Sequence, residues 1–522
     1  MANPAPFFRV FFSQKLPRGF FQCSKCIRNE TIAGPIAGGV GSVSSRRWLS
    51  IYRASEQAFV RQSVPAKATV TRPLPSKSVK TSPFEQFKRL YSEALASEKT
   101  AGAKKQSSFP DISDKKVAHW LLGCAASVFG IVIFGGLTRL TESGLSITEW
   151  RPVTGSLPPM SQEDWESEFA KYKDSPEYHI INPHMNLQEF KNIYYMEWIH
   201  RLWGRFIGLA FIFPAIYFVS KRKVSKPMAW KLGGIAGLLG FQGVIGWWMV
   251  ASGLVDDLFA PGSHPRVSQY RLTTHLGAAF ILYIAMLTSG LGILRAHNLF
   301  KVPKDGMALL KQLGDPKMKV MRRSVAGLAV LIFITAMTGG LVAGLDAGLI
   351  YNDFPYMGTG LTPPKSELFD EHYCRKEDKS DLWWRNMCEN PSLVQLDHRI
   401  CALTTFTACC ALFAYSRTGR MKALLPRAAA RGVHGVLGFA TLQASLGIAT
   451  LIFLVPTPLA SLHQAGALLL LTWTFVLGSR VWIPARTSRL LASALKGQHV
   501  RLSGVSPLSA SARVKPVTPK NV

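Results

Sequence analysis

Apolar residues gather in eight long segments of this 522-residue chain, and polar or charged residues fill the stretches between them. Each segment is close to the ~20 residues that an α-helix needs to cross the hydrocarbon core of a bilayer. The pattern therefore predicts an all-α polytopic membrane protein with eight transmembrane helices. The predicted spans are residues 117–137, 197–219, 229–252, 270–293, 324–344, 394–415, 432–454 and 459–479.

The second four segments repeat the first four. The match is continuous from Gly135 to Leu145 against Gly339 to Leu349, and it recurs in order in the later segments. Because four spans return the chain to its starting side, the two halves share one orientation. We expect two tandem four-helix bundles, residues 113–294 and 324–480. The aligned pairs are Gly135 with Gly339, Glu142 with Asp346, Glu197 with Gln395, His200 with His398, Gln242 with Gln443, Gly246 with Gly447, and His275 with His463.

Four histidines, His200, His275, His398 and His463, lie near the starts of four separate apolar segments at equivalent places in this repeat. An ionisable residue in a membrane span is costly and is a candidate functional residue. One such histidine could be an interfacial anchor, but four at one depth point to a site. Zinc normally takes four N, S or carboxylate ligands, whereas two facing helices can supply both axial ligands of a heme iron. We therefore predict two bis-histidine heme sites, one in each half.

The halves differ one helical turn before the first histidine of each pair. Glu197 shares a helical face with His200, whereas the equivalent residue in the second half is Gln395. A carboxylate beside a porphyrin can take up protons or stabilise positive charge on a carbon that is being oxidised. We expect Glu197 to be catalytic, the alternative being a carboxylate that is only solvated or hydrogen-bonded. Arg201 and Arg399 either pair with heme propionates or anchor their spans.

The N-terminal segment has the composition of a targeting sequence. Residues 1–55 are basic and rich in phenylalanine and contain a single acid, Glu30. This composition predicts a mitochondrial transit peptide, the alternative being a basic arm that binds nucleic acid or lipid. Residues 56–112 are predicted to form a polar matrix linker without a core of its own.

The net charge of +30 also predicts the orientation of the spans. Residues 295–323 form a predicted basic loop and residues 481–522 a basic tail, whereas the loops at 138–196 and 345–393 are richer in acid. The positive-inside rule places the basic segments in the matrix. Both termini then lie in the matrix and the histidines lie near the intermembrane space, so the charge needs no nucleic-acid partner.

Two of the eight cysteines lie together in a predicted intermembrane-space loop. These are Cys374 and Cys388, and that compartment permits disulfides. A bridge between them and two free thiols are both compatible with the sequence. Cys23 and Cys26 form a CxxC motif inside the predicted transit peptide, so no zinc or redox role is expected for them.

Several motifs resemble those of the heme A synthase family of mitochondria and aerobic bacteria. The resemblance covers about residues 117–480 and includes the order and spacing of all four histidines. The motifs are Phe134-Gly135-Gly136-Leu137-Thr138-Arg139-Leu140-Thr141, Glu197-xx-His200-Arg201-xx-Gly204-Arg205, Thr274-His275-Leu276 and Leu396-Asp397-His398-Arg399.

The resemblance implies that one pyrrole methyl group of heme O is oxidised to the formyl group of heme A, which cytochrome c oxidase requires. It implies that His200 and His275 hold the substrate heme, that Glu197 assists its oxidation, and that His398 and His463 ligate a resident heme b. It places the protein in the mitochondrial inner membrane, surrounded by lipid, with heme O synthase and a ferredoxin-type electron donor as partners. A homo-oligomer is compatible with it.

Two other functions remain open from the residues. A diheme b-type cytochrome would only carry electrons and would have no reason to differ at Glu197. A transporter built from parallel repeats would carry broken spans and polar residues near the bilayer midplane, whereas the ionisable residues here lie near one face. Many bacterial relatives carry a cysteine pair in the loop after the first span, and residues 138–196 contain none. We therefore expect no thiol-dependent step in that loop.

Overall fold

The computed structural model describes residues 109–260 and 263–497. This part of the chain is helical without any β-strand, apart from one isolated bridge between Met357 and Gly360. Eight of its helices are long and apolar enough to cross a membrane, which confirms the eight predicted spans. The predicted transit peptide, residues 1–55, and most of the predicted linker lie outside the described residues.

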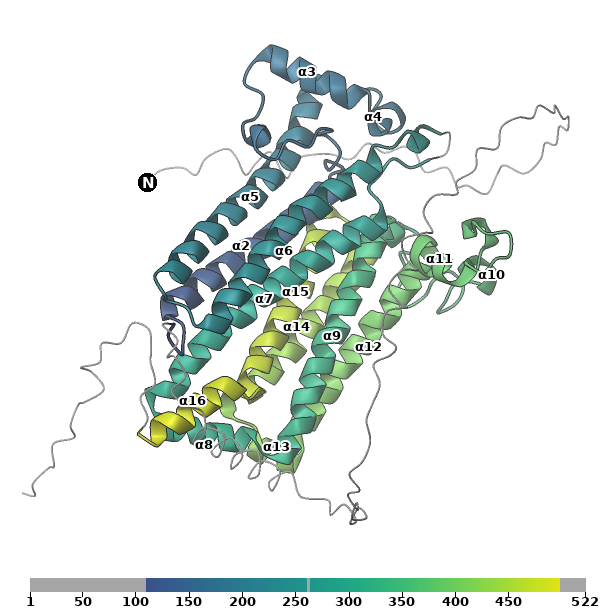
Figure 1. Ribbon diagram of the computed structural model, residues 1–522. Helices are drawn as coiled ribbons and strands as arrows, with labels where there is room; N and C mark the ends of the chain where they lie inside the picture. Colours follow the sequence, from purple (N-terminus) through teal and green to yellow (C-terminus); the bar gives the residue numbers. More distant parts are fainter. Residues whose placement is uncertain (1–108, 261–262, 498–522) are drawn as a thin grey trace, which may run out of the picture. The chain divides into compact units, whose positions relative to one another are not determined.

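The spanning helices are α2 (Lys115–Leu140), α5 (Leu187–Ser220), α6 (Lys226–Val250), α7 (Gln269–Lys301), α9 (Pro316–Gly344), α12 (Pro391–Arg417), α14 (Arg427–Ile452) and α15 (Thr457–Val481) (Figure 1). The shorter α-helices are α3 (Gln162–Lys173), α4 (Pro176–Ile180), α8 (Pro303–Leu313), α10 (Lys365–Leu368), α11 (Leu382–Glu389), α13 (Gly419–Leu424) and α16 (Ala485–Leu495). The 3₁₀ turns are η3 (Thr154–Ser156), η4 (Ala251–Gly253), η5 (Asp256–Phe259), η6 (Ala347–Leu349) and η7 (Glu371–Tyr373).

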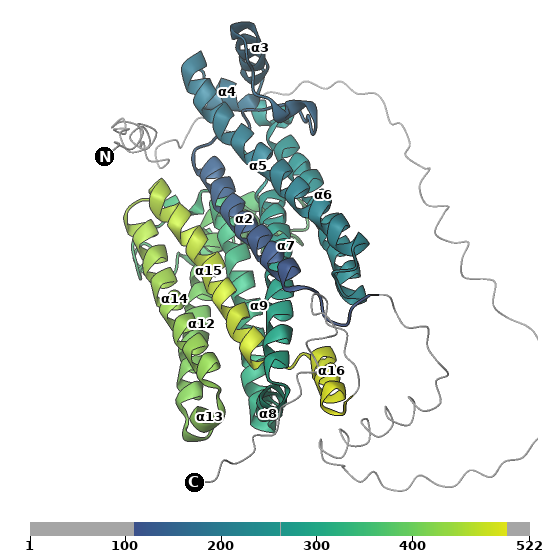
Figure 2. The same cartoon turned by 90° about the vertical axis from the view of Figure 1, so that its left-hand side faces the viewer.

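The helices of each half pack in a ring of four. In the N-terminal half, α2 and α6 each pack against both α5 and α7, and in the C-terminal half, α9 and α14 each pack against both α12 and α15. Between the halves, α7 packs against α9, and α15 packs against α2 and α7 (Figure 1, Figure 2). One buried apolar cluster runs through both rings, with Phe211, Met286, Met321 and Leu471 among its fully buried members. These contacts place each pair of histidine-bearing helices within one ring.

Helix α5 begins well before the predicted start of its span at residue 197. Asn186 caps it, since its side chain accepts from the backbone N–H of Glu189 while the Glu189 carboxylate accepts from that of Asn186. Such a capping box satisfies two backbone donors at a helix start. The added turns place Phe190 in an aromatic cluster with Trp165 and Tyr172 of α3. The predicted boundary was wrong because hydropathy marks the apolar segment, whereas packing on α3 stabilises further turns.

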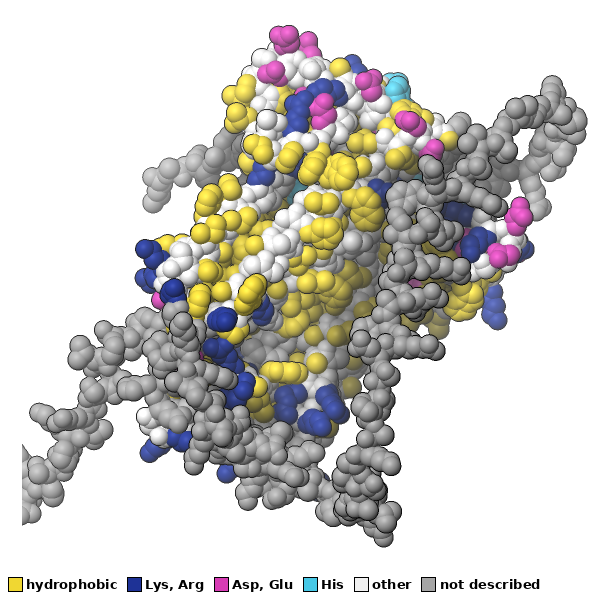
Figure 3. Space-filling model, in the orientation of Figure 1, with side chains coloured by type: hydrophobic (Ala, Val, Ile, Leu, Met, Phe, Trp, Pro, Cys, Tyr) yellow, Lys and Arg dark blue, Asp and Glu magenta, His cyan; other side chains and the backbone are white. Residues whose placement is uncertain are grey.

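The two ends of the helices differ in charge. The histidine end, defined here as the end at which α5, α7, α12 and α15 begin, carries most of the visible Asp and Glu, whereas Lys and Arg gather at the opposite basic end (Figure 3). Residues 295–323, predicted as a basic matrix loop, contain the end of α7, all of α8 and the start of α9. The predicted basic tail likewise contains α16, which packs on α8 through Leu310 and Leu491.

Candidate heme sites

The C-terminal pair of histidines has the geometry of two axial ligands. His398 of α12 and His463 of α15 face each other with ring centroids 6.4 Å apart and ring planes at 90°. Metal–imidazole bonds are about 2 Å long, so one metal ion between the rings requires centroids roughly 6 Å apart. In the described part of the chain, no group of three or more His, Cys, Asp and Glu is arranged to hold a metal. The donor set therefore fits an iron whose other ligands come from a porphyrin.

A glycine on a neighbouring helix lies against each of the four imidazoles. A Cβ atom built at Gly447 would lie 2.8 Å from Cε1 of His463, and one built at Gly135 would lie 2.8 Å from Cε1 of His200. The corresponding distances are 3.0 Å for Gly339 and His398, and 3.3 Å for Gly246 and His275. Only glycine lets the helix backbone approach the rings this closely. Sequence reasoning did not assign these glycines to the sites, although their recurrence in both halves was the available signal.

The N-terminal pair lies in the equivalent place of the other ring of helices. His200 lies on α5 and His275 on α7, the two helices that α2 and α6 both contact. Phe134 of α2 stacks parallel to the His200 ring, with centroids 6.5 Å apart and an angle of 7°. Gln242 of α6 donates from its side-chain amide to the backbone carbonyl of His275 at 3.2 Å. The structure thus brings together both of the predicted pairs.

The two sites differ in how Nδ1 of each imidazole is held. In the C-terminal half, Nδ1 of His398 lies 2.9 Å from the Thr338 hydroxyl, and Nδ1 of His463 lies 3.1 Å from the Gln443 amide nitrogen. In the N-terminal half, Nδ1 of His200 and Nδ1 of His275 are buried and have no hydrogen-bond partner. The two halves therefore place equivalent histidines in sites that differ in the contacts of Nδ1.

Glu197 is buried, with an exposed fraction of 3 %, and each of its carboxylate oxygens accepts two hydrogen bonds. Oε2 accepts from the Ser146 hydroxyl and from the Ile147 backbone N–H, both at 2.8 Å. Oε1 accepts from Nε and Nη2 of Arg201 at 3.0 and 2.6 Å. Arg201 also donates to the backbone carbonyls of Ile147 and Glu149. Arg201 therefore fixes the loop that follows α2, and its two predicted roles, a pair with a heme propionate or an anchor of its span, stay predictions.

The C-terminal half repeats this arrangement with an amide in place of the carboxylate. Gln395 donates from its side chain to the Tyr351 carbonyl at 2.9 Å, and Arg399 donates to the carbonyls of Tyr351 and Tyr356 at 3.0 and 3.1 Å. Tyr351 is the repeat equivalent of Ile147, so each half ties the loop after its first span to its first histidine helix. The difference that remains between the halves at this place is one negative charge.

Comparison with known proteins identifies the family. Residues 118–475 match the family model described as cytochrome oxidase assembly protein, COX15-CtaA. The chain belongs to this family. It is 48% identical over 464 residues to heme A synthase COX15 of Saccharomyces cerevisiae, covering 88% of this chain and 93% of that protein. It is 44% identical over 362 residues to heme A synthase COX15 of Homo sapiens, covering 69% of this chain and 81% of that protein.

A third relative is a two-part protein. The chain is 54% identical over 374 residues to the heme A synthase-mitochondrial ferredoxin fusion protein of Schizosaccharomyces pombe, covering 71% of this chain and 60% of that protein. The rest of the fusion protein lies outside the aligned region.

In this member of the COX15-CtaA family, contacts at the histidine end join the two halves. Asp346, the repeat equivalent of Glu142, pairs with Arg139 at 2.9 Å and with Arg266 at 3.0 Å. Gln464, which follows His463, donates to the backbone carbonyl of Val132 on α2 at 2.8 Å. Because α2 also carries Gly135 against His200, one helix contacts elements of both heme sites.

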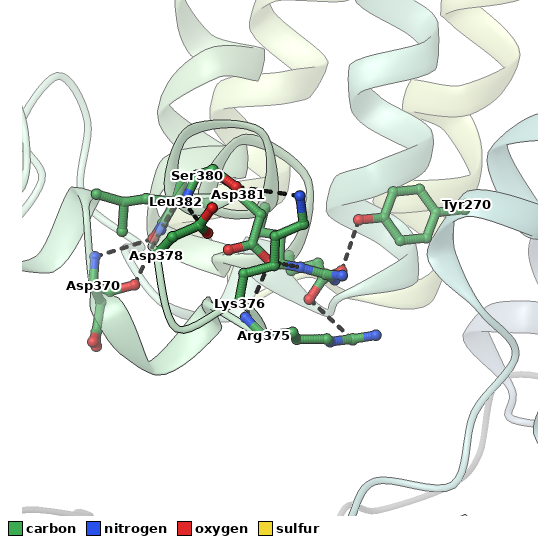
Figure 4. A network of polar contacts seen from close by, with 11 residues as sticks. Tyr270, Asp370, Arg375, Lys376, Asp378, Ser380, Asp381 and Leu382 are labelled. Atoms are coloured by element: carbon green, nitrogen blue, oxygen red, sulfur yellow. Dashed lines mark hydrogen bonds and ion pairs between the residues drawn. The ribbon is translucent and has the colours of Figure 1, made fainter.

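A polar network fixes the second acidic loop of this COX15-CtaA protein against α7 (Figure 4). The Tyr270 hydroxyl donates to Glu389 at 2.9 Å, and Arg385 donates to Glu389 at 2.6 Å and to Asp381 at 2.7 Å. Tyr270 lies just over one helical turn before His275, so the network positions the start of a histidine helix. Cys374 and Cys388 of this loop are free thiols in the structure, and a bridge between them stays a prediction.

Proposed function

We propose that this chain is a heme A synthase, which oxidises one pyrrole methyl group of heme O to the formyl group of heme A for cytochrome c oxidase. Membership of the cytochrome oxidase assembly family supports this function, as do the names of the S. cerevisiae and human relatives. The structural observation that carries the proposal is the pair of imidazoles of His398 and His463, 6.4 Å apart and perpendicular, with a second pair at the repeat-equivalent place.

The two sites divide the work in this proposal. His398 and His463 hold a resident heme b, which supplies one-electron redox chemistry when it is bound. His200 and His275 hold heme O as the substrate. Two differences support this division: Glu197 adds a negative charge only in the N-terminal half, and only the C-terminal imidazoles have partners at Nδ1. A resident group needs a firmly held site, whereas a substrate must leave as product.

Glu197 acts as a fixed negative charge in this mechanism. Removal of electrons from a methyl carbon places positive charge on that carbon, and a preorganised opposite charge stabilises the transition state. The four donors around the carboxylate hold it in one orientation before the reaction begins. Uptake of a proton by Glu197 would break this set of hydrogen bonds. Of the two roles predicted from the sequence, stabilisation of charge therefore fits the contacts better.

The membrane and the partners follow from the same proposal. The protein lies in the mitochondrial inner membrane, with the basic end in the matrix and the histidine end toward the intermembrane space. A ferredoxin-type protein supplies electrons, which the naming of the S. pombe relative as a fusion with mitochondrial ferredoxin supports. Heme O synthase supplies the substrate, and a homo-oligomer stays an expectation from the sequence.

The test replaces Glu197 with Gln and measures the hemes extracted from the purified protein and from the membranes that contain it. Gln395 beside Arg399 shows that this fold accepts an amide at the equivalent place, so packing and heme content should survive. Loss of one preorganised group commonly costs ~10²-fold or more in rate, so heme O should accumulate while heme A falls. Glu168→Gln, which removes a carboxylate paired with Lys171 on α3, is the matched control.

Three results would contradict parts of this proposal. If a stably folded Glu197→Gln protein makes heme A at the normal rate, Glu197 has no catalytic role. If Glu168→Gln loses as much activity, the effect is a general response to lost charge. If the wild-type protein leaves heme O unchanged under conditions in which it is reduced and supplied with oxygen, the chain is an electron-carrying diheme cytochrome and the proposed reaction is wrong.

A further inference from the structure

We infer that Thr338 is a positioning residue for His398: its hydroxyl accepts the Nδ1–H of His398 and thereby sets the tautomer, orientation and electron donation of one axial ligand of the resident heme. This inference rests on the proposed function, because it requires an iron porphyrin between His398 and His463. It concerns α9, which carries neither histidine of that pair.

The direction of the hydrogen bond follows from the second partner of Thr338. Oγ1 of Thr338 lies 2.8 Å from the backbone carbonyl of Thr335, which has no proton to give, so the Thr338 hydroxyl donates its only proton there. Its lone pairs then face Nδ1 of His398 at 2.9 Å. Nδ1 must therefore carry the proton, which leaves Nε2 as the unprotonated nitrogen. That tautomer is the one that binds a metal through Nε2.

The repeat supplies a natural comparison within the same chain. The residue equivalent to Thr338 is Phe134, which stacks on the His200 ring and offers no acceptor to Nδ1. The second histidines also differ, because the Gln443 amide nitrogen contacts both Nδ1 and the backbone carbonyl of His463, whereas Gln242 contacts only the carbonyl of His275. An amide nitrogen only donates, so Gln443 is not an acceptor of the kind that Thr338 gives His398. The acceptor argument therefore applies to His398, whereas Nδ1 of each N-terminal histidine has no hydrogen-bond partner.

An acceptor at Nδ1 changes how an imidazole binds iron. A hydrogen bond from Nδ1–H to an acceptor raises the basicity of a metal-bound imidazole and fixes its orientation. A more basic ligand stabilises ferric iron more than ferrous iron, so it lowers the reduction potential of the heme. Thr338 therefore keeps the resident heme firmly bound and reducing. The N-terminal ligands lack this support and can release a heme more readily, which suits a substrate site.

The experiment uses the full-length protein purified with its heme and compares Thr338→Val, Thr338→Ser and Thr405→Val. Thr338→Val keeps the shape and removes the hydroxyl acceptor, which leaves the backbone carbonyl of Thr335 as the remaining partner of the His398 ring, whereas Thr338→Ser keeps the hydroxyl. Thr405→Val removes another buried hydroxyl of the same half, one whose hydroxyl partner is Thr335 at 2.8 Å. The measurements are the midpoint potential of heme b and the rate at which heme b transfers to an excess of apomyoglobin.

Thr338→Val should raise the ferrous-to-ferric ratio of heme b about tenfold at a fixed potential. For a one-electron couple this is a rise of about 59 mV in the midpoint potential. Loss of such a partner typically costs 10–100-fold in metal affinity, so heme b should also leave about tenfold faster or more. Thr338→Ser and Thr405→Val should stay within about twofold of wild type. If Thr338→Val retains no heme while Thr338→Ser retains it, the same conclusion holds.

Other outcomes overturn the inference or the function beneath it. An unchanged potential and transfer rate in Thr338→Val, or equal changes in Thr405→Val, would show that Thr338 does not act through His398. If Thr338→Val does not fold, Thr338→Ala takes its place, with the same expected and contrary results. The heme b content of the wild-type protein, and its dependence on His398, is measured before any Thr338 variant. If the wild-type protein holds no heme b, or holds heme b that does not require His398, the proposed function is refuted.

Discussion

Replacement of Gly447 by Ala should remove heme b from the C-terminal site. A Cβ atom at this position would lie 2.8 Å from Cε1 of His463. Carbon atoms pack best at about 3.5 to 4.0 Å, so the ring would have to move by about 0.7 Å. Metal sites tolerate deviations of about ±0.2 Å in their bond lengths. The imidazole therefore cannot keep both its place beside α14 and its bond to iron.

The magnitude follows from the same geometry. The Gln443 amide nitrogen, on the same helix as Gly447, lies 3.1 Å from Nδ1 of His463 and 2.9 Å from its backbone carbonyl, which limits how far the ring can shift. Displacement of a ligand in such a site should cost at least the 10–100-fold in affinity that loss of an outer partner costs. Gly339→Ala, with a contact of 3.0 Å, should have a similar but smaller effect, and Gly246→Ala, at 3.3 Å, should have the mildest effect on its own site.

The assay is the amount of heme b per purified protein, from extracted heme and from the low-spin absorption spectrum. Gly438→Ala is the control, because Gly438 lies on the same helix and a Cβ atom there would meet no atom within 4 Å. Each Gly→Ala substitution should stabilise the helix by up to about 1 kcal/mol. An effect of helix propensity on heme content would therefore be the same in both variants. Full heme b content in Gly447→Ala, or an equal loss in Gly438→Ala, would refute the reasoning.

Two further predictions concern the loops. Burial raises the pKa of Glu177 in α4 from 4.5 to about 8. Between these pH values the folded loop binds more protons than the unfolded loop. Its free energy of unfolding should therefore fall, as the pH rises through this window, by up to about 1.4 kcal/mol per pH unit. Glu177→Gln should flatten this dependence in hydrogen exchange of residues 162–182, and an unchanged slope would show that another group titrates. A protease applied outside mitoplasts should cut within residues 361–380 and spare α8, and the reverse pattern would invert the proposed orientation.

Local and periodic features of the sequence were enough to predict the spans and the histidine pairs. A span can be recognised from the sequence because the favourable transfer free energies of its apolar residues add up along the chain. The repeat made the histidines interpretable, since His200 and His398 recur at one place and His275 and His463 at another. The ring of helices then brought His398 and His463 to the distance that one iron requires.

Other features depended on residues that are distant along the chain. The sequence paired Glu197 with Gln395, but only the structure showed that Ser146, Ile147 and Arg201 surround the carboxylate. Likewise, α8 occupies part of the predicted loop at 295–323, because α16 covers its apolar face. The apolar positions of α8 and α16 indicate that each helix has a face to bury, but not which element covers it, and the contacts of Glu197 leave no trace in hydropathy.

The sequence by itself thus determined the eight spans, the internal repeat, the four candidate histidines and the single charge by which the two halves differ. Tertiary structure alone decided the contacts of each imidazole, because Thr338 reaches His398 from another helix while Phe134 takes the equivalent place beside His200. It also decided where backbone must lie against an imidazole, as at Gly447. The physical reason is that transfer free energy accumulates residue by residue, whereas a hydrogen bond or a close approach exists only once two distant segments have packed.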